Sequence, residues 1–500
     1  RVSGAQNRRM LSARFDNQFT TEDNRQLWAL SDLLSVDAGA NYMVRRILRM
    51  RSRYAYHNNP FFMGAANRLA KFVIGTGPTL HMSSASASVN RKIETEFGRW
   101  AVRVNLARKL RVSRAARFYN GEGFNLLRTN PKVAHRVKLD LFEIEADQVS
   151  SPLLGVYPAQ FPDQYFDGIT LDPWGNKECF QVLRQHPGAF GAFAMMGYVY
   201  DSWPAELVLH DYARMRPFQQ RGIPECVPAL DLFEELRRGR KAVVAAWETA
   251  ADFAGFVKTQ GPPLSDDEVT ADTGFGDEMD YVDVRRRKMG VLPEGYDVTQ
   301  MKAEQPTTTY DMFTMTLLME IGQVLDMPLF ILTGDARLAN MSSAYVASQS
   351  FMNSVAVDRQ EYESLLEQLF DQWIAEASRY PGYLPLESTA ASLDHSWRWP
   401  RVHAHADPQK MASAQNQRLK NGSSCPSIEN AIEGREDFDE MCERAAADYG
   451  VPVSEYKAAL FQSTFTERGT VAPGAVTPNT GTDGPHDPND LDNEGDDPED

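Results

Sequence analysis

The chain has 500 residues and a formal net charge of −16, and its hydrophobic and charged fractions of 42% and 24% are ordinary for a globular protein. This length suggests roughly two to four domains. A net acidic chain is a poor candidate for a tight, non-specific DNA binder, because neutralising phosphates needs clustered Lys and Arg, so the charge excludes a repressor or a histone-like protein. It does not exclude a protein that DNA merely passes.

The N-terminal part is predicted to be helical. Residues Asn59–Val73 have the pattern of a helix, with Pro60 at its start and Gly75 as its stop. Ala87–Tyr119 is a second, basic helical stretch whose pattern is interrupted near Val104.

Between Phe124 and His210 the pattern changes to short strands. Val137–Glu145 alternates apolar and polar residues over much of its length, which is typical of a strand with one buried face. Asp172–Asn176 is predicted to be a turn between two such runs. Leu207–His210 ends this β-rich part.

Three long helices are predicted next. Apolar residues recur at helical spacing over Glu225–Thr259, a length on the order of 50 Å at 1.5 Å per residue. The second helix covers about Thr308–Met327 and is ended by Pro328, and the third runs over about Ser342–Arg379. Helices this long are expected to pack against neighbours along their length.

The C-terminal part is predicted to be helical and then disordered. It is mostly helical after Pro400, with breaks at Pro408, Gly422 and Gly434. From about Arg468 the chain is rich in Gly, Pro, Thr, Asn and Asp, too polar to bury the apolar surface that ordering requires. A solvated tail is the simpler interpretation, and a segment that orders on a partner is the alternative.

Charge is distributed unevenly. Residues 1–130 hold 22 Lys and Arg against 8 Asp and Glu, whereas residues 481–500 hold 9 acidic residues and no basic ones. Residues 266–283 contain eight acidic residues, and Arg285, Arg286, Arg287 and Lys288 follow at once. Such a block usually marks a solvated loop, but its place between two predicted helices favours an inserted excursion.

The pattern of cysteines indicates a reducing compartment, and the hydropathy of the chain predicts no membrane-spanning segment. No C-x-x-C pair occurs, which argues against a disulfide scaffold or a zinc ribbon. No segment reaches about 18 consecutive apolar residues, so no transmembrane helix is expected. The chain opens with Arg1 rather than Met, which predicts a trimmed start, and this basic opening lacks the apolar region of a signal peptide. The four cysteines are Cys179, Cys226, Cys425 and Cys442.

Motifs for enzyme chemistry are weak. The sequence has no G-x-x-x-x-G-K-[S/T], H-E-x-x-H or G-x-S-x-G motif. His403, His405 and Asp407 are the best metal candidates, because residues i and i+2 share one face of a strand, although surface histidines are the more ordinary interpretation. His210 with Cys226 would suit a nucleophile pair, but a strand-end His and a buried Cys explain them better.

The order of the parts carries more information than any single motif. A basic helical start is followed by a β-rich section, a long helix, a charged insert, a second helix, a loop and a third helix. The segments that follow this order are Asn59-Pro60, Ile74–Gly77, Trp203–His210, Arg216–Pro224, Gln305-Pro306, Met327–Phe330, Gly334-Asp335, Ser342-Ser343, Trp399-Pro400, Asp407-Pro408, Ala414, Arg418-Leu419 and Gly422. Together they resemble the lambda-family portal proteins of tailed bacteriophages over about residues 20–450. Phe218 is a departure, because family members often have Gly there.

The resemblance implies an α+β, mostly helical portal fold with wing, stem, clip and crown, which assembles into a ring, typically a dodecamer. Long helices that cannot bury their apolar stripes alone fit such a ring. The implied parts are an N-terminal region and α/β wing (1–223), the first stem helix (224–260), the clip (261–305), the second stem helix (306–328), the tunnel loop (329–341), a wing helix with the following wing segment (342–406), the crown (407–467) and a disordered acidic tail (468–500).

The resemblance also implies which residues act. The tunnel loop is expected to line the channel and the clip is expected to dock partners, because both charge signs favour partner choice and fast association. For Asp335 alone, a capping and turn role is the simpler interpretation. The tunnel-loop residues are Thr333, Gly334, Asp335, Arg337, Asn340 and Met341, and the clip residues are Asp277, Glu278, Arg285, Arg286, Arg287 and Lys288.

The implied function is a portal at one capsid vertex, the channel through which double-stranded DNA is packaged and ejected. The expected partners are further copies of the chain, the large terminase, a head–tail adaptor, the major capsid and scaffold proteins and DNA in transit, with no membrane. The expected location is the virion, with the host cytoplasm during assembly. No enzyme activity, metal or cofactor is expected, since the terminase would supply ATP hydrolysis. The alternative is a metal-dependent nuclease or another DNA-processing enzyme of the phage head.

Overall fold

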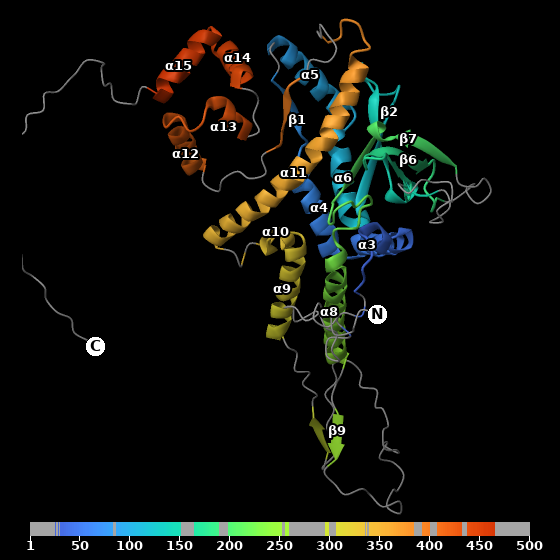
Figure 1. The fold of residues 1–500 in the computed structure, drawn as a ribbon. Helices are drawn as coiled ribbons and strands as arrows, with labels where there is room; N and C mark the ends of the chain where they lie inside the picture. The colour runs from blue at the N-terminus through green and yellow to red at the C-terminus, as the bar shows by residue number, and fades with distance from the viewer. Residues whose placement is uncertain are drawn as a thin grey trace, which may run out of the picture. The chain divides into compact units, whose positions relative to one another are not determined.

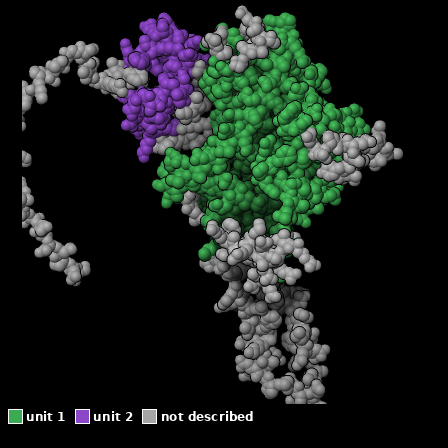
Figure 2. Space-filling view, in the orientation of Figure 1, with its two compact units in different colours: residues 1–402 green, residues 403–500 purple. Residues whose placement is uncertain are grey.

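The computed structural model describes residues 31–83, 87–151, 165–189, 199–252, 256–259, 296–299, 307–335, 340–384, 393–400, 408–432 and 438–465, together with 26, 29 and 337. The chain divides into two compact units, residues 1–402 and 403–500 (Figure 2). Each unit is described by itself.

The first unit begins with helices α2 (Val36–Gly39), α3 (Tyr42–Asn58) and α4 (Pro60–Ile74) (Figure 1). The predicted helix α4 is confirmed together with its end signals. The side chain of Asn59 accepts hydrogen bonds from the first turn, and Gly75 follows the helix at φ 57°. A Cβ on Gly75 would lie 2.7 Å from the ring of Pro400, so glycine is required there both for conformation and for space.

The predicted interruption of the second helical stretch is also confirmed. Helix α5 (Ala87–Arg103) ends just before Asn105, and α6 (Leu106–Asn120) begins just after it. Asn105 has φ 55°, a left-handed conformation that ends a helix and that Asn tolerates better than most residues. Strand β1 (Thr79–Met82), which lies between α4 and α5 in the chain, pairs antiparallel with the distant strand β11 (His395–Arg398).

Two antiparallel sheets form the β-rich part. Strand β2 (Glu122–Thr129) lies between β3 (Leu139–Ile144) and β8 (Val208–Tyr212). The second sheet has the order β4 (Tyr165–Phe166), β5 (Ile169–Leu171), β6 (Lys177–Leu183) and β7 (Tyr200–Pro204). Side chains from both sheets share one hydrophobic cluster, which includes Phe124, Ile144, Ile169, Phe180 and Val208.

The predicted strands and turn of this region are confirmed. The Asp172–Asn176 turn connects β5 to β6, and Asp172 Oδ1 accepts hydrogen bonds from the N–H groups of Trp174 and Asn176 at 2.9 and 2.7 Å. A carboxylate that satisfies two backbone donors explains why this short polar run turns rather than continues as a strand.

The first long helix is shorter than predicted. Helix α8 covers Val227–Asp252, and the expected continuation to Thr259 is wrong, because Phe256–Thr259 forms strand β9, which pairs antiparallel with β10 (Tyr296–Thr299). The apolar residues at Phe256 and Val257 fit a helical period, but they belong to a hairpin of aromatic and β-branched residues.

The remaining long helices agree closely with the expected ranges. Helix α9 covers Thr307–Val324, the short α10 covers Leu329–Thr333 and α11 covers Met341–Ala377. α9 ends three residues earlier than predicted, in a tight turn where Asp326 has φ 49°. Helices α4, α5, α6, α8, α9, α10 and α11 share the main hydrophobic core, whose largest fully buried side chains include Trp100, Trp373, Phe62, Phe97 and Phe233.

The second unit contains four helices in its described residues: α12 (Pro408–Lys420), α13 (Pro426–Ile432), α14 (Phe438–Tyr449) and α15 (Val453–Phe465). Pro408 begins α12, and Gly422 follows it at φ 72°, so the predicted breaks at these residues are confirmed. Gly434 lies outside the described residues. Within the described part of the whole chain, no helix is both long and apolar enough to cross a membrane.

Candidate functional site

A buried ion-pair network joins the start of α8 to α6 and α11. Arg114 on α6 donates to Glu225, just before α8, at 2.8 Å and to Asp358 on α11 at 2.7 Å. One helical turn further along, Arg117 donates to the same two carboxylates at 2.6 and 3.1 Å. Because each guanidinium has a rigid fork of donors, the two arginines fix the relative placement of three segments that are far apart in sequence.

This charge cluster, which we call the α6 network, is electrostatically balanced. Burial lowers the pKa of Arg114 and of Arg117, but the carboxylates of Glu225 and Asp358 outweigh it, so both pKa values lie above the ordinary range. Conversely, burial acts to raise the pKa of Asp358, and the two arginines hold it below its usual value. Removing one member would leave a buried charge without a partner.

The α6 network extends to strand β8 through Asp211. Its carboxylate lies 3.5 Å from Arg117 Nη1 and accepts a hydrogen bond from the Tyr362 hydroxyl on α11. Burial raises the pKa of Asp211, which the neighbouring arginines only partly offset. The network therefore connects the three-stranded sheet to α11 as well as to α8.

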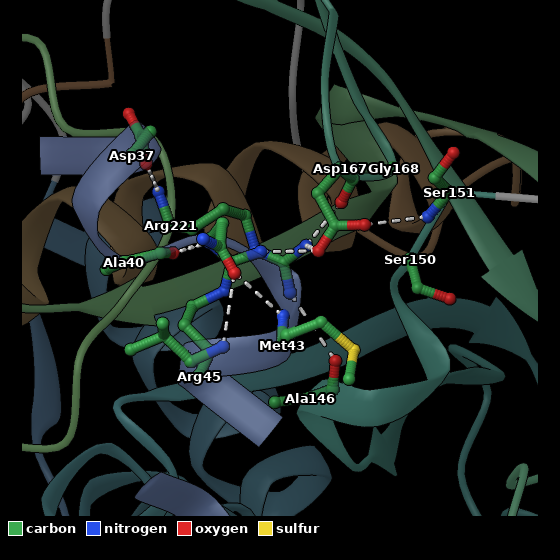
Figure 3. A network of polar contacts seen from close by, with 12 residues as sticks. Asp37, Ala40, Met43, Arg45, Ala146, Ser150, Ser151, Asp167, Gly168 and Arg221 are labelled. Carbon is green, nitrogen blue, oxygen red and sulfur yellow. Dashed lines mark hydrogen bonds and ion pairs between the residues drawn. The ribbon is translucent and has the colours of Figure 1, made fainter. Parts of the chain in front are cut away.

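A second buried network, the α3 network, holds helix α3 to the sheets (Figure 3). Arg45 and Arg221 converge on the carboxylate of Asp167, and the backbone N–H of Ser151 donates to its other oxygen at 2.9 Å. Arg221 also donates to Glu122 on β2 at 2.6 Å. These arginines lie in the interior, and Arg45 and Arg221 are only 2% and 1% exposed.

Glu122 is the centre of the α3 network. It is fully buried, and it accepts hydrogen bonds from Arg49, Arg221, the backbone N–H of Gly222 and His210. Burial acts to raise the pKa of Glu122, but Arg221, His210 and Arg49 outweigh it and hold the pKa well below its usual value. The carboxylate is therefore charged and fully hydrogen-bonded, as a buried charge requires.

The proposed tunnel-loop residues run from the last residue of α10, Thr333, to the first residue of α11, Met341. Arg68 on α4 donates to the carbonyl oxygens of Leu332 and Thr333 and so caps the end of α10. Gly334 has φ 78°, which is a left-handed conformation that favours glycine, and its missing side chain leaves room for Arg68.

Asp335 organises the start of the loop. Its carboxylate accepts hydrogen bonds from the backbone N–H of Arg337 at 3.0 Å and from the Arg337 guanidinium at 2.6 Å. This agrees with the turn role expected for Asp335. The Arg337 side chain is exposed, and at the other end of the loop Asn340 caps α11 through the N–H of Ser343 at 2.8 Å. Met341 begins α11 and is exposed.

Other predicted site residues lie outside the described residues or apart from each other. His210 contacts Glu122 and Lys177, whereas the Cys226 thiol donates to the Ser52 hydroxyl at 3.3 Å, so the two do not form a nucleophile pair. This agrees with the interpretation of a strand His and a buried Cys. The predicted clip residues and metal candidates lie outside the residues that the structure describes. They are Asp277, Glu278, Arg285, Arg286, Arg287, Lys288, His403, His405 and Asp407.

Within the described residues, Glu145, Asp147 and His186 have the spacing of a metal site, with ligand atoms within 4.8 Å of one another. Arg53 occupies this cluster, because its Nη2 lies 3.1 Å from Glu145 and also contacts Asp147. A guanidinium already supplies the positive charge that a cation would bring. The cluster is best explained as part of the contacts between α3 and the sheets.

Neither arginine network was predicted from the sequence. Arg114 and Arg117 were predicted only as part of a basic helical stretch, although their spacing of three places both on one face. A basic residue surrounded by apolar core positions, such as Leu110 and Phe118, is the signal that would have suggested an interior role.

Comparisons with known proteins identify the family. The sequence model of "Phage portal protein, lambda family" matches residues 28–375, which is most of the chain. No curated protein sequence matches.

Three solved structures contain a similar chain. One, from the neck of an empty GTA particle, is 14% identical, with a TM-score of 0.48 over 77% of this chain and 92% of that one. Another, from the virion of a native gene transfer agent particle, is 13% identical, with a TM-score of 0.43 over 83% and 100%. An HK97-family phage portal protein from Corynebacterium diphtheriae is 12% identical, with a TM-score of 0.29 over 59% and 82%.

The family match extends from α2 almost to the end of α11, and so includes both arginine networks and the α10–α11 loop. Members of this family are structural parts of the particle, which leaves no support for the nuclease alternative. The chain belongs to the lambda family of phage portal proteins.

Proposed function

We propose that this portal protein forms a ring at one vertex of the capsid, and that the ring is the channel through which double-stranded DNA is packaged and ejected. The observation that supports this most directly is the amount of apolar surface that a single subunit leaves uncovered on its long helices. Apolar helix faces of this kind are expected to pack against another subunit.

The ends of α8 and α9 farthest from the core carry this surface. Trp247 on α8 is 53% exposed, and Met312 and Phe313 on α9 are 73% and 51% exposed. The same two helices bury Phe233 and Ile321 completely near the core. The helices are therefore stabilised at one end by their own subunit and have apolar side chains without cover at the other.

Helix α3 also has an uncovered apolar surface, and its buried face is polar. Its buried face carries the arginines of the α3 network, while its exposed face carries Met43, Ile47, Met50 and Tyr54, which recur at helical spacing. A polar face inside and an apolar face outside is the reverse of the arrangement in an isolated soluble protein. A neighbouring subunit that covers this face removes the contradiction.

The proposal also assigns the parts of the portal. We assign α8 and α9 to the stem, residues 261–305 to the clip, residues 329–341 to the tunnel loop and residues 342–406 to the long wing helix with the following wing segment. Residues 1–223 are assigned to the N-terminal region and wing, and residues 407–467 to the crown. The α6 network then holds the base of the stem to the wing helix.

DNA is expected to pass through this channel without being held. Residues 1–130 are basic, but the remainder of the chain is strongly acidic, and an acidic channel wall repeated around a ring disfavours lasting contact with phosphates. The large terminase and later a head–tail adaptor are the proposed partners at the clip, and the major capsid and scaffold proteins at the wing. Assembly would take place in the host cytoplasm.

Docking at the clip is tested by charge reversal. Replacing Arg285, Arg286, Arg287 and Lys288 by Glu is expected to weaken binding of terminase or adaptor to the purified ring, measured by co-sedimentation. The Lys-for-Arg version of the same run keeps the charge and is the control. Unchanged binding by the Glu variant would remove the docking role from this run.

Ring formation is tested at α9. A double substitution of Met312→Asp and Phe313→Asp places charge in the uncovered apolar surface, and we expect the assembled particle to be replaced by free subunits in analytical ultracentrifugation. Glu320→Gln, at an exposed polar position of the same helix, should assemble normally. Rings that form unchanged with the double substitution would show that this surface does not lie between subunits.

A further inference from the structure

A hollow of about 460 Å³ opens between the four-stranded sheet, strand β8 and helix α11, and none of its lining residues belongs to the α10–α11 loop, α3 or α9. The proposed channel function uses none of its chemistry. Its lining combines aromatic and apolar walls with polar and charged groups. The charged groups are Lys177, Arg214, Arg117, Asp211 and Glu361, of which the two carboxylates pair with Arg117.

Lys177, the first residue of β6, has an unusual environment for a lysine. Its Nζ atom lies 2.8 Å from Nδ1 of His210 and 4.2 Å from the centre of the Tyr212 ring. No carboxylate of the described residues lies within ion-pair distance of it. By contrast, Lys109 Nζ lies 2.5 Å from the carboxylate of Asp140, which is the ordinary arrangement for a partly buried lysine.

His210 is held in one orientation. Its ring stacks between Phe124 and Tyr212, with centroids 4.2 and 4.3 Å away, and its Nε2 lies 3.0 Å from Glu122. Because the Glu122 carboxylate only accepts hydrogen bonds, the proton of the neutral imidazole is on Nε2. Nδ1 is then an acceptor, so it takes an N–H from Lys177 and leaves the lone pair of a neutral Lys177 amine unused.

The surrounding charges favour this neutral amine. Burial first, and then Arg214 and Arg221, lower the pKa of Lys177, Glu122 and Asp37 act in the other direction, and the net result is a pKa of about 7. Burial and then Lys177 lower the pKa of His210 to about 3, so His210 does not compete for the proton. A lysine of which about half is neutral near pH 7 is nucleophilic where an ordinary lysine is not.

Two arginines line the hollow, and only one of them is available to a ligand. Arg117 is engaged by the carboxylates of Glu225 and Asp358 in the α6 network. Arg214 is exposed, its Nε donates to the Tyr212 hydroxyl at 3.2 Å, and no described carboxylate pairs with it. Arg214 and Lys177 approach the same Tyr212 ring, since the Arg214 Cζ is 5.8 Å from its centre.

We propose that this hollow is a covalent modification site for small aldehydes that carry an anionic group, with Lys177 as the nucleophile and Arg214 as the partner of the anion. The amine nitrogen adds to the carbonyl carbon to form a carbinolamine. The carbonyl oxygen takes up the two amine protons through solvent and leaves as water, and an imine is formed. No oxidant or reductant is required.

The test uses the full-length protein with pyridoxal 5′-phosphate as the anionic aldehyde and pyridoxal as its uncharged counterpart. Borohydride then traps any imine, and peptide mass spectrometry measures the modified fraction at each lysine. We expect modification of Lys177 to exceed that of Lys109 by at least about tenfold at pH 7.5, because the neutral fraction of an ordinary lysine is very small there. Modification of Lys177 should rise with pH around a midpoint of about 7.

Three variants separate the roles. Lys177→Arg keeps a positive charge and should abolish the preferred modification, whereas Lys109→Arg should leave it unchanged. Arg214→Gln should reduce modification by the phosphorylated aldehyde to the level reached with pyridoxal and should not affect pyridoxal itself. Labelling spread evenly over surface lysines, or equal labelling of Lys177 by both aldehydes, would overturn the proposal. Particle assembly is a separate readout, so neither result depends on whether the ring proposal is correct.

Discussion

Arg114 on α6 and Asp358 on α11 are 244 positions apart in the chain, yet the guanidinium donates two hydrogen bonds to one carboxylate oxygen, at 3.0 and 2.7 Å. The same guanidinium reaches Glu225 at the base of α8. In the proposed assembly, this contact is where the stem meets the long wing helix. Buried charges therefore join α8 and α11 to α6 in addition to apolar packing.

Removing the charge of Asp358 is expected to destabilise the subunit. Asp358→Asn removes one of the two carboxylates that Arg114 and Arg117 share in the interior. We expect the free energy of unfolding to fall by about 3 kcal/mol. Asp371→Asn, at an exposed position of the same helix, is the control and should have little effect. Denaturant unfolding of the unassembled subunits measures both. A loss for Asp358→Asn no larger than that of the control would mean that the α6 network contributes nothing to stability.

Stability should fall in acid because of Glu122. Its pKa is well below the ordinary value in the folded chain, so the unfolded chain takes up a proton first as the pH falls. The stabilisation from Glu122 is present in full above about pH 4.3 and is lost as the pH falls from there through the folded pKa. Buried Asp211, whose pKa is raised, contributes a slope of the opposite sign.

The measurement is the denaturation midpoint between pH 6 and pH 3. Glu122→Gln should be less stable than wild type at pH 6 and should show a flatter dependence below about pH 4.3, since the titrating group is gone. Glu206→Gln, at an exposed position, should follow the wild-type curve. An unchanged slope in Glu122→Gln would exclude Glu122 as the source.

The α10–α11 loop should affect DNA handling and not assembly. Asp335 and Arg337 pair with each other at the surface. Because such surface ion pairs contribute little to stability, replacing both residues by Ala should not unfold the subunit. We expect rings to form normally and the amount of packaged or retained DNA to fall, measured by nuclease-protected DNA per particle. Rings that fail to form would count against the tunnel-loop assignment.

Phe218 is the residue at which the chain departs from its family, and it is in a left-handed conformation with φ 61°. Because glycine adopts this conformation without a Cβ penalty, Phe218→Gly should change the free energy of unfolding by no more than about 1 kcal/mol, despite losing the ring contact with Phe166. Phe218→Val, with a branched Cβ, should lose about 1–2 kcal/mol. Thermal melting separates the two, and a Gly variant less stable than the Val variant would contradict this explanation.

The sequence predicted those elements whose signals are local. Helix α4 has a cap at Asn59 and a stop at Gly75, and the break at Asn105 interrupts the apolar period within a few residues. The end of α8 was mistaken because strand β9 depends on pairing with β10, whose first residue, Tyr296, lies far along the chain. A pairing over such a distance leaves no trace in the local period.

Helix α3 and the arginine networks were missed for a different reason. The periodicity argument assumes that the buried face is apolar, and α3 buries Arg45 and Arg49. Their partners Asp167 and Glu122 are 122 and 73 positions away, so no local spacing reveals the pairs. In the proposed ring a neighbouring subunit covers the exposed apolar face of α3, and a single sequence does not show such a contact.

The central claim is that the chain assembles into a ring with a channel, and electron microscopy of the purified full-length protein tests it most directly. The account predicts class averages of a ring of several hundred kilodaltons with a central hole, and no cleavage of DNA when a divalent metal ion is added. A compact single subunit that cuts DNA in the presence of the metal would contradict it.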